Sequence, residues 1–184
     1  MRVIAGALKG RQLVTPRGAT TRPTADQVRI ALMDALTPWL PGARLLDLFA
    51  GAGAVGLEAL SRGAAHATFV ERAGRAAAAL LQNVRTLGVG GRARVLRGDV
   101  ARQLTRLAGL GERFEIVFLD PPYAEDAVDR TLAALGAGEL VAPEGLVIAQ
   151  HFTKRRPADE YRALRAFRDR RFGETTLTFF RAGG

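Results

Sequence analysis

The chain contains no cysteine, only two histidines and only two lysines among its 184 residues. Without cysteine there are no disulfides or thiolate metal ligands, and two histidines are too few for an ordinary zinc centre. No apolar run is long enough to cross a bilayer, and Arg2 and Lys9 interrupt the N-terminus before a signal-peptide core could form. We therefore expect a cytoplasmic protein with no metal and no membrane attachment.

The length and a hydrophobic fraction of 48% suit one domain with a single core. We expect residues 1–184 to form that domain, with 1–21 as an N-terminal extension. The formal net charge of +9 is confined to the ends, because residues 1–43 contribute +4, residues 44–150 contribute nothing and residues 151–184 contribute +5. A neutral centre with basic ends favours a protein that holds a polyanion through its phosphates, although an arginine bias of the genome would also raise the charge.

Strand-like apolar runs alternate with amphipathic stretches along most of the chain, which is typical of a parallel sheet covered by helices on both faces. The pattern predicts strands over 44–49, 67–71, 93–96, 114–120 and 145–150. It predicts helices over about 54–62, 74–87, 100–108 and 126–136. Residues 174–181 are rich in β-branched and aromatic side chains and predict a last, antiparallel strand.

The N-terminal region has a different texture. Residues 2–5 and 11–14 flank a glycine- and lysine-containing turn and predict a basic β-hairpin. A capping-box pattern at Thr24 to Gln27 then predicts the start of a helix that Pro38 ends.

A glycine-rich turn follows the first core strand, where the backbone can approach a bound nucleotide closely. Gly51, Gly53 and Gly56 match the dinucleotide pattern G-x-G-x-x-G, and Glu71 stands twenty residues past Gly51, so an NAD-dependent oxidoreductase is one reading. Asp47, however, precedes the glycines, where a carboxylate would repel a pyrophosphate but could bind a cationic ammonium directly or through water. This favours S-adenosyl-L-methionine, whose methionine end carries such a group.

Acidic side chains also follow the next two strands. Glu71 can accept hydrogen bonds from both ribose hydroxyls, and Asp99 can accept one from an adenine amino group while the Val100 N–H faces the ring edge. Each acid alone is more simply a helix cap or a solvated side chain. Three acids at successive strand ends converge on the crevice where such sheets bind ligands.

The sharpest motif is Asp120-Pro121-Pro122-Tyr123 at the end of the fourth strand. An exocyclic base amine is a poor nucleophile, because its lone pair is delocalised into the ring. The Asp120 carboxylate and the Pro121 carbonyl could each accept one N–H and so aim the nitrogen at a methyl group. Tyr123 could stack on a base flipped out of its own stack. A proline-rich turn with a packed tyrosine is the structural alternative.

With these motifs the chain resembles the bacterial small-subunit ribosomal RNA guanine-N2 methyltransferases. The likeness runs almost end to end, through the blocks Arg2-Val3-Ile4-Ala5-Gly6, Arg22-Pro23-Thr24-x-Asp26-x-Val28-Arg29, Asp47-Leu48-Phe49-Ala50-Gly51-x-Gly53, Leu57-Glu58-Ala59-Leu60-Ser61-Arg62-Gly63-Ala64, Asp120-Pro121-Pro122-Tyr123 and Leu177-Thr178-Phe179-Phe180-Arg181. The resemblance implies a Rossmann-like, seven-stranded methyltransferase sheet and N2 methylation of one guanine in the small ribosomal subunit. It also implies that Arg22 and Thr24 lie over the methionine end of the cofactor.

The expected site follows from both lines of reasoning. Catalysis is assigned to Asp120, Pro121, Pro122 and Tyr123. The cofactor-binding set is Asp47, Phe49, Gly51, Gly53, Glu71, Arg72, Asp99, Val100, Arg22 and Thr24. The RNA-binding set is Arg2, Lys9, Arg11, Arg17, Lys154, Arg155 and Arg156. We expect a monomer that binds ribosomal RNA. An adenine-N6 methyltransferase and a non-catalytic RNA-binding module that keeps the cofactor fold stay open as alternatives.

Overall fold

The computed structural model describes residues 1–16, 23–122 and 126–183. Its element order is α1 (Pro23–Leu36), β1 (Arg44–Leu48), α2 (Ala54–Ser61), β2 (His66–Glu71), α3 (Gly74–Leu87), β3 (Ala93–Arg97), α4 (Val100–Gly109), β4 (Phe114–Leu119), α5 (Ala127–Ala137), β5 (Val141–Phe152), β6 (Glu160–Tyr161), β7 (Leu164–Phe172) and β8 (Thr175–Ala182). Among these helices, none has the length and apolarity of a membrane span.

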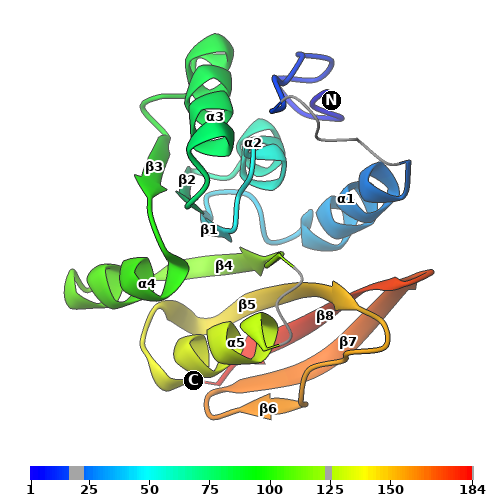
Figure 1. The fold of residues 1–184 in the computed structure, drawn as a ribbon, viewed down its shortest axis with the longest axis vertical. Coiled ribbons are helices and arrows are strands. Elements are labelled where there is room, and N and C mark those ends of the chain that lie inside the picture. Colours follow the sequence, from blue (N-terminus) through cyan, green and yellow to red (C-terminus); the bar gives the residue numbers. More distant parts are fainter. Residues whose placement is uncertain (17–22, 123–125, 184) are drawn as a thin grey trace.

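The strands form one mixed sheet in the order β3-β2-β1-β4-β5-β8-β7-β6. The first five are parallel, and β8, β7 and β6 extend the sheet with antiparallel pairings (Figure 1). The expected Rossmann-like sheet and its antiparallel terminal strand are therefore confirmed. The implied count of seven strands is wrong, because the sheet has eight. The arginine-rich segment before β8 forms the long strand β7, and the two-residue strand β6 pairs with β7 at the edge of the sheet.

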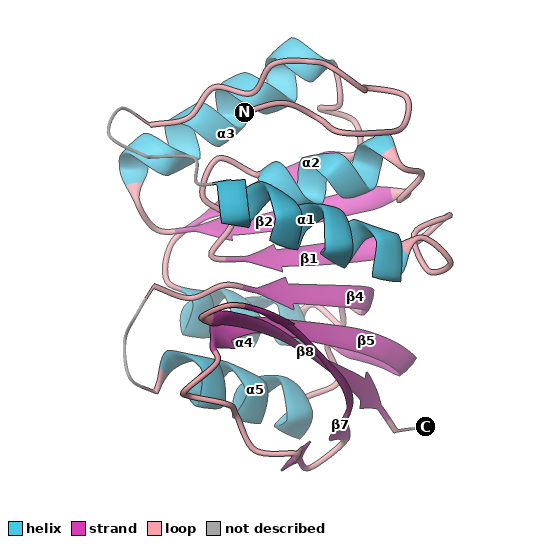
Figure 2. Ribbon diagram, turned by 90° about the vertical axis from the view of Figure 1, so that its right-hand side faces the viewer, coloured by secondary structure: helices cyan, strands magenta, loops and turns pink. Residues whose placement is uncertain are grey.

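Helices cover both faces of the sheet (Figure 2). One apolar core lies between the sheet and α1, α2 and α3, and it includes Leu32, Leu57 and Leu80. A second lies between the sheet and α4 and α5, and it includes Leu104 and Leu132. Because both faces of the central strands are buried, their sequences read as continuous apolar runs rather than as alternating patterns.

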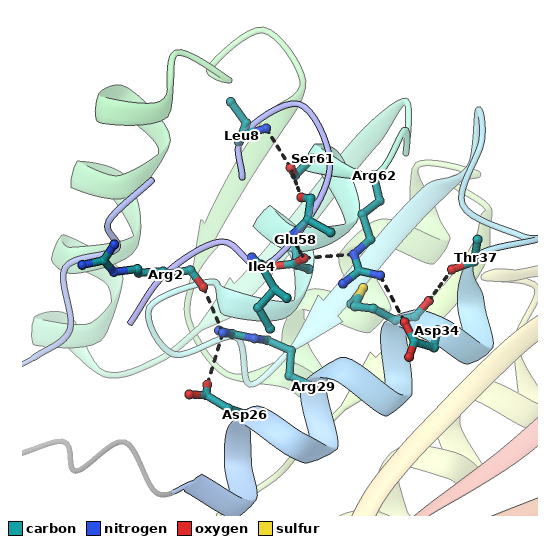
Figure 3. Close-up of polar contacts among 12 residues, drawn as sticks. Arg2, Ile4, Leu8, Asp26, Arg29, Asp34, Thr37, Glu58, Ser61 and Arg62 are labelled. Atoms are coloured by element: carbon teal, nitrogen blue, oxygen red, sulfur yellow. Dashed lines mark hydrogen bonds and ion pairs between the residues drawn. The ribbon is translucent and has the colours of Figure 1, made fainter. Parts of the chain in front are cut away.

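The expected N-terminal β-hairpin is present only as a short pairing of its two arms. Arg2 and Gln12 form one antiparallel bridge, and backbone N–H groups of Val3, Gly10 and Leu13 donate to the carbonyls of Arg11, Val3 and Met1, but no named strand forms. Other backbone donors of this segment are taken by α2. The N–H groups of Ile4 and Ala5 donate to the Glu58 carboxylate at 2.8 and 2.9 Å, and the N–H of Leu8 donates to Ser61 Oγ at 2.9 Å (Figure 3).

Glu58 is the centre of this attachment. Its side chain is 1% exposed, and it also accepts a hydrogen bond from Arg62 Nε at 2.9 Å. A buried carboxylate with three donors exchanges its hydration for fixed partners. The N-terminal segment is thereby fastened to α2 and lies beside α1, where Arg29 Nη2 donates to the carbonyl of Arg2 at 3.0 Å (Figure 3).

We expect Glu58→Ala to lower the free energy of unfolding by about 3–5 kcal/mol, because it leaves Arg62 and two backbone donors without their buried partner. Urea denaturation followed by circular dichroism measures this. The control is Glu139→Ala, which removes an exposed ion pair with Arg113 from a side chain that is 85% exposed and should cost less than about 1 kcal/mol. Equal losses in the two variants would show that Glu58 does not anchor the segment.

Candidate active site

The carboxyl ends of the parallel strands meet at one edge of the sheet, and the predicted site residues of the core lie along it. Asp120 directly follows β4, and the glycine turn directly follows the neighbouring strand β1. The two lie side by side because Leu48, at the end of β1, pairs with Leu119, at the end of β4. Glu71 ends β2, and Asp99 follows β3. Segments far apart in the sequence are therefore brought to one crevice, as the parallel topology predicts.

The glycine turn is shaped by two different needs. Gly51 has a φ of 58°, and a side chain there would enter open space, so its backbone borders a hollow. Gly53 has a φ of 87°, and a Cβ would stand 2.3 Å from Leu80 Cδ1, so this glycine permits close packing against α3. Phe49 also has a positive φ, of 62°, which is a strained conformation for a side-chain-bearing residue. Of the two glycines expected to contact a cofactor, Gly51 is the one that faces the hollow.

Asp47 lies beneath this turn. Its side chain is 1% exposed, and Oδ2 accepts a hydrogen bond from the N–H of Gly56 at 3.0 Å, at the start of α2. Burial raises the pKa of Asp47 to about 7, against the lowering effect of the Gly56 donor, and the charges of Asp120 and Glu71 raise it further. Asp47 therefore shares the crevice with both acids, but it supports the turn and does not line the pockets described below.

The largest of these pockets has a volume of about 630 Å³ and runs over the ends of β2, β3 and β4. We call it the β2–β4 pocket, and its lining residues are Phe49, Val70, Glu71, Arg72, Ala73, Asp99, Val100, Asp120, Pro121 and Pro122. Five residues of the expected cofactor-binding set are thus brought together in one cavity.

Two of the three acids of this pocket, Glu71 and Asp99, are held by backbone donors. Glu71 accepts hydrogen bonds from the N–H groups of Gly51 and Ala73, each at 2.7 Å. Asp99 caps α4 by accepting from the N–H of Arg102 at 3.2 Å. Because each carboxylate oxygen can accept more than one hydrogen bond, both side chains keep acceptor capacity toward the pocket. The structural and the ligand-binding interpretations of these acids are compatible.

A second cavity lies on the other side of Asp120-Pro121-Pro122. This β5–α5 pocket has a volume of about 270 Å³, and it is lined by Asp120, Pro121, Pro122, Val128, Asp129, Gln150, His151, Phe152, Arg155, Arg156 and Thr175. A third cavity of about 340 Å³ lies against α1 and the N-terminal segment, with Met1, Thr15, Asp26, Gly51, Asp120 and Gln150 among its lining residues. Asp120 borders all three cavities.

Asp120 is exposed toward these cavities. The protein around it removes part of its hydration, which raises the pKa of Asp120 to about 6. Its carboxylate is therefore ionised at neutral pH and can accept hydrogen bonds from a bound ligand. Tyr123, the last residue of the motif, lies outside the described residues, as do Arg22 and Arg17. Thr24 lies in the first turn of α1.

The expected RNA-binding residues form two groups. Arg2, Lys9 and Arg11 are exposed on the N-terminal segment, where Arg11 Nη2 also donates to the Thr86 carbonyl at 2.6 Å. The second group is Lys154, Arg155 and Arg156, which are exposed in the loop after β5. Arg155 and Arg156 line the β5–α5 pocket.

Arg156 is fixed at that pocket by two carboxylates. It pairs with Asp159 and Asp169, each at 2.7 Å, and these partners raise the pKa of its guanidinium. The Arg156 guanidinium is therefore held by partners within the protein. We expect Lys154 to contribute more than Arg156 to the binding of RNA phosphates.

Asn83 is a structural partner of the site that the sequence analysis missed. Its amide, 1% exposed on α3, accepts from the Val14 N–H at 2.7 Å and donates to the carbonyls of Val14 and Ala52 at 2.9 and 3.0 Å. It therefore ties the N-terminal segment to the glycine turn. The available signal was an asparagine on the apolar stripe of a predicted helix, beside Leu80 and Val84.

A mainly parallel sheet with an antiparallel end, a nucleoside-sized pocket over its carboxyl edge and an Asp-Pro-Pro corner defines the class of Rossmann-like methyltransferases. The family described as Conserved hypothetical protein 95 matches residues 1–181, and the chain belongs to it.

Relatives support this membership. YlbH of Bacillus subtilis (strain 168) is 40% identical over 151 residues, which are 82% of each chain. Ribosomal RNA small subunit methyltransferase D of Escherichia coli (strain K12) is 39% identical over 150 residues, which are 82% of this chain and 74% of the relative. The solved structure of yhhF from Escherichia coli has a TM-score of 0.88 at 33% identity, with 100% of this chain and 98% of that chain covered. The resemblance to the ribosomal RNA methyltransferases is thereby confirmed.

A more distant solved structure shares the fold. It is complexed with SAH, has a TM-score of 0.66 at 16% identity, and is matched over 88% of this chain and 50% of its own.

The raised pKa of Asp47 predicts a pH-dependent stability. The native state holds a proton that the unfolded chain releases near pH 4, so this contribution is full below about pH 4 and is lost as the pH rises through about 7. We expect Asp47→Asn to gain roughly 2–4 kcal/mol relative to the unchanged protein between about pH 5 and 8. Urea denaturation across that range measures the difference. For the exposed Asp126→Asn, the difference in the free energy of unfolding from the unchanged protein should not vary with pH. A difference for Asp47→Asn that did not vary with pH would refute the raised pKa.

Proposed function

We propose that the chain transfers a methyl group from S-adenosyl-L-methionine to the exocyclic N2 amino group of a guanine in small-subunit ribosomal RNA. The observation that carries this proposal is the shared wall. Asp120, Pro121 and Pro122 border the β2–β4 pocket on one side and the β5–α5 pocket on the other. A donor and an acceptor that occupy the two pockets would meet at this wall.

The β2–β4 pocket fits the proposed cofactor in its chemistry. Glu71 and Asp99 offer carboxylate acceptors for ribose hydroxyls and an amino group, and Phe49 and Val70 offer apolar wall for a ring. Gly51 also lines the third cavity, the one beside α1, which is large enough for a side chain such as that of methionine. The crevice around Asp47, Glu71 and Asp120 is acidic, which suits a cationic ligand.

The bound cofactor would supply an electrophilic methyl group on a sulfonium. The protein has to make the guanine amine nucleophilic and orient it. The Asp120 carboxylate accepts one N–H of the amine and the Pro121 carbonyl accepts the other, which localises the nitrogen lone pair and fixes its direction. After transfer, the methylated nitrogen loses a proton, which Asp120 or water accepts, so no histidine is required.

The choice of guanine rests on Asp129. Guanine carries an N1–H donor next to N2, whereas adenine carries an unprotonated N1 next to N6. Asp129 on α5 lines the β5–α5 pocket together with Asp120, and the Tyr161 hydroxyl donates to its Oδ1. Burial and this contact raise the pKa of Tyr161 to about 12, so the hydroxyl remains a donor and holds the carboxylate in place. Asp129 can therefore accept N1–H of guanine and would repel N1 of adenine.

The basic ends hold the RNA around this site. We propose phosphate contacts for Arg2, Lys9, Arg11 and Lys154, since these side chains are exposed on the N-terminal segment and on the loop beside the β5–α5 pocket. The whole chain would act as one catalytic domain and as a monomer. The relatives named as small-subunit ribosomal RNA methyltransferases support small-subunit RNA as the substrate.

We expect Asp120→Ala to lower kcat by about 100- to 1,000-fold, because the amine loses its main acceptor. In the unchanged protein, kcat should rise with pH through about 6 as Asp120 ionises. The assay is transfer of labelled methyl to small-subunit RNA, followed by nucleoside analysis for N2-methylguanine. Binding of S-adenosylhomocysteine should persist in the variant, and Asp126→Ala is the control. A product methylated at adenine N6 would refute the proposed reaction.

We expect Asp129→Asn to act on base selection. Once the methylated guanine has been located, an RNA with 2-aminopurine at that position keeps the N2 amine but lacks N1–H. The unchanged protein should show a kcat/KM about 10- to 100-fold lower on this RNA than on the guanine RNA. Asp129→Asn should lower kcat/KM on the guanine RNA and so reduce the difference in kcat/KM between the two RNAs. Asp126→Asn, directly before the same helix, should preserve the full difference in kcat/KM between the two RNAs. An equal difference in both variants would exclude Asp129 as the N1–H acceptor.

A further inference from the structure

One face of the C-terminal strands is left uncovered. Figure 2 shows β8 and β7 curving out below α1, with none of the described helices over the side that faces the viewer. On this side Trp39, Phe167, Arg168, Arg170 and Arg181 come together, and we call them the arginine–aromatic face. Trp39 belongs to the turn after α1, and the other four belong to β7 and β8.

The pairing of β7 with β8 puts the arginines on this side. Arg168 pairs with Phe179, whose ring belongs to the core under α1, and the Arg168 guanidinium lies 5.9 Å from that ring. Arg170 reaches α1 itself, where Nη1 donates to the Ala31 carbonyl at 3.1 Å. The strand is irregular between Ala166 and Arg168, so Phe167 is an extra residue that the bulge turns outward.

The acid of β7 points the other way. Asp169 pairs with Thr178 and contacts Arg156 beside the β5–α5 pocket, on the opposite face of the sheet. Arg181 has Glu144 at 4.0 Å, but Arg168 and Arg170 have no carboxylate partner among the described residues. The face therefore carries uncompensated positive charge.

Aromatic rings alternate with these cations. The Arg181 guanidinium lies between two rings, 5.3 Å from that of Trp39 and 5.4 Å from that of Phe167. Both rings nevertheless stay accessible, with Trp39 40% and Phe167 54% exposed. Large aromatic side chains exposed together usually mark a contact surface, and arginine stacking fixes these two in place.

We propose that the arginine–aromatic face binds a single-stranded segment of the substrate RNA, with phosphates on Arg168 and Arg181 and bases stacked on Phe167 and Trp39. The proposal rests on the proposed function for the identity of the RNA. Exposed rings interleaved with cations are the chemistry of single-stranded nucleic-acid binding, where stacking and phosphate contacts act together. A purely apolar partner would leave the arginine charges unpaired.

The position of the face suits one continuous substrate. The nine residues of β7 span roughly 30 Å and run toward the carboxyl edge of the sheet, where Phe172 pairs with Thr175. Thr175 lines the β5–α5 pocket. An RNA strand whose flipped guanine occupies that pocket would pass round the carboxyl edge of the sheet near Phe172 and then follow the other face of β7 to Phe167 and Trp39.

The test compares two charge reversals that change the net charge equally. Arg168→Glu lies on the face, and Arg106→Glu lies on α4, which covers the opposite side of the sheet. With a small-subunit RNA transcript as the probe, Arg168→Glu should weaken binding about tenfold and flatten the logarithmic salt dependence by about 0.7, while Arg106→Glu should change binding less than about twofold. Phe167→Ala should weaken binding at least about fivefold.

Trp39 provides a direct reporter, since it is the only tryptophan in the chain. The transcript should quench its fluorescence in the unchanged protein and in Arg106→Glu, and much less in Arg168→Glu. Thermal unfolding and binding of S-adenosylhomocysteine should be equal in all three proteins, which separates a lost contact from a damaged fold.

Equal weakening by both charge reversals, or no quenching of Trp39, overturns the proposal. So does an Arg168→Glu variant that binds the transcript normally but fails only on assembled subunits, because the face would then contact a protein. If the variants behave as expected while the unchanged protein methylates no guanine, the proposed function fails and the RNA-binding face stands.

Discussion

The parallel pairing of β1 with β4 is the constraint on which the site depends. Because Leu48 pairs with Leu119, the glycine turn and the Asp120 corner emerge side by side at one edge of the sheet. Parallel strands end at the same edge, so Glu71 and Asp99 join them from β2 and β3. A different order of strands would carry the same motifs on separate parts of the molecule, and no shared wall between two pockets would exist.

This arrangement concentrates acidic side chains at one edge of the sheet, with Asp47 buried and Asp120 exposed. The pKa values of Asp47 and Asp120 are both raised, mainly by loss of hydration. Backbone donors from Gly56 and Gly51 compensate part of the cost at Asp47 and Glu71. A cationic ligand would offset the remaining repulsion among these carboxylates, so its binding would lower the free energy of the folded protein. Such a site trades native-state stability for ligand binding.

The two ends of the chain add surfaces to this neutral centre, and both were only partly predictable. The sequence predicted the pairing of the two N-terminal arms, which is limited to one bridge, but not that Glu58 would fasten Ile4 and Ala5 to α2. The strand β7 was not predicted, because its outward residues are arginines and its bulge at Phe167 breaks the alternation of a half-buried strand. In both cases long-range partners outweigh the local pattern.

The sequence by itself determined the parallel core, the glycine turn, the acids at the strand ends and the Asp-Pro-Pro corner, because periodicity and turn chemistry are local properties. Only the tertiary structure decided that Asp47 lies beneath the turn, that Asn83 joins the turn to the N-terminal segment, and that Tyr161 holds Asp129 beside Asp120. Asp47 and its donor Gly56 are nine positions apart, whereas the contacts of Asn83 and of Tyr161 join residues more than thirty positions apart. Their geometry depends on strand register and on helix placement, which no local pattern encodes.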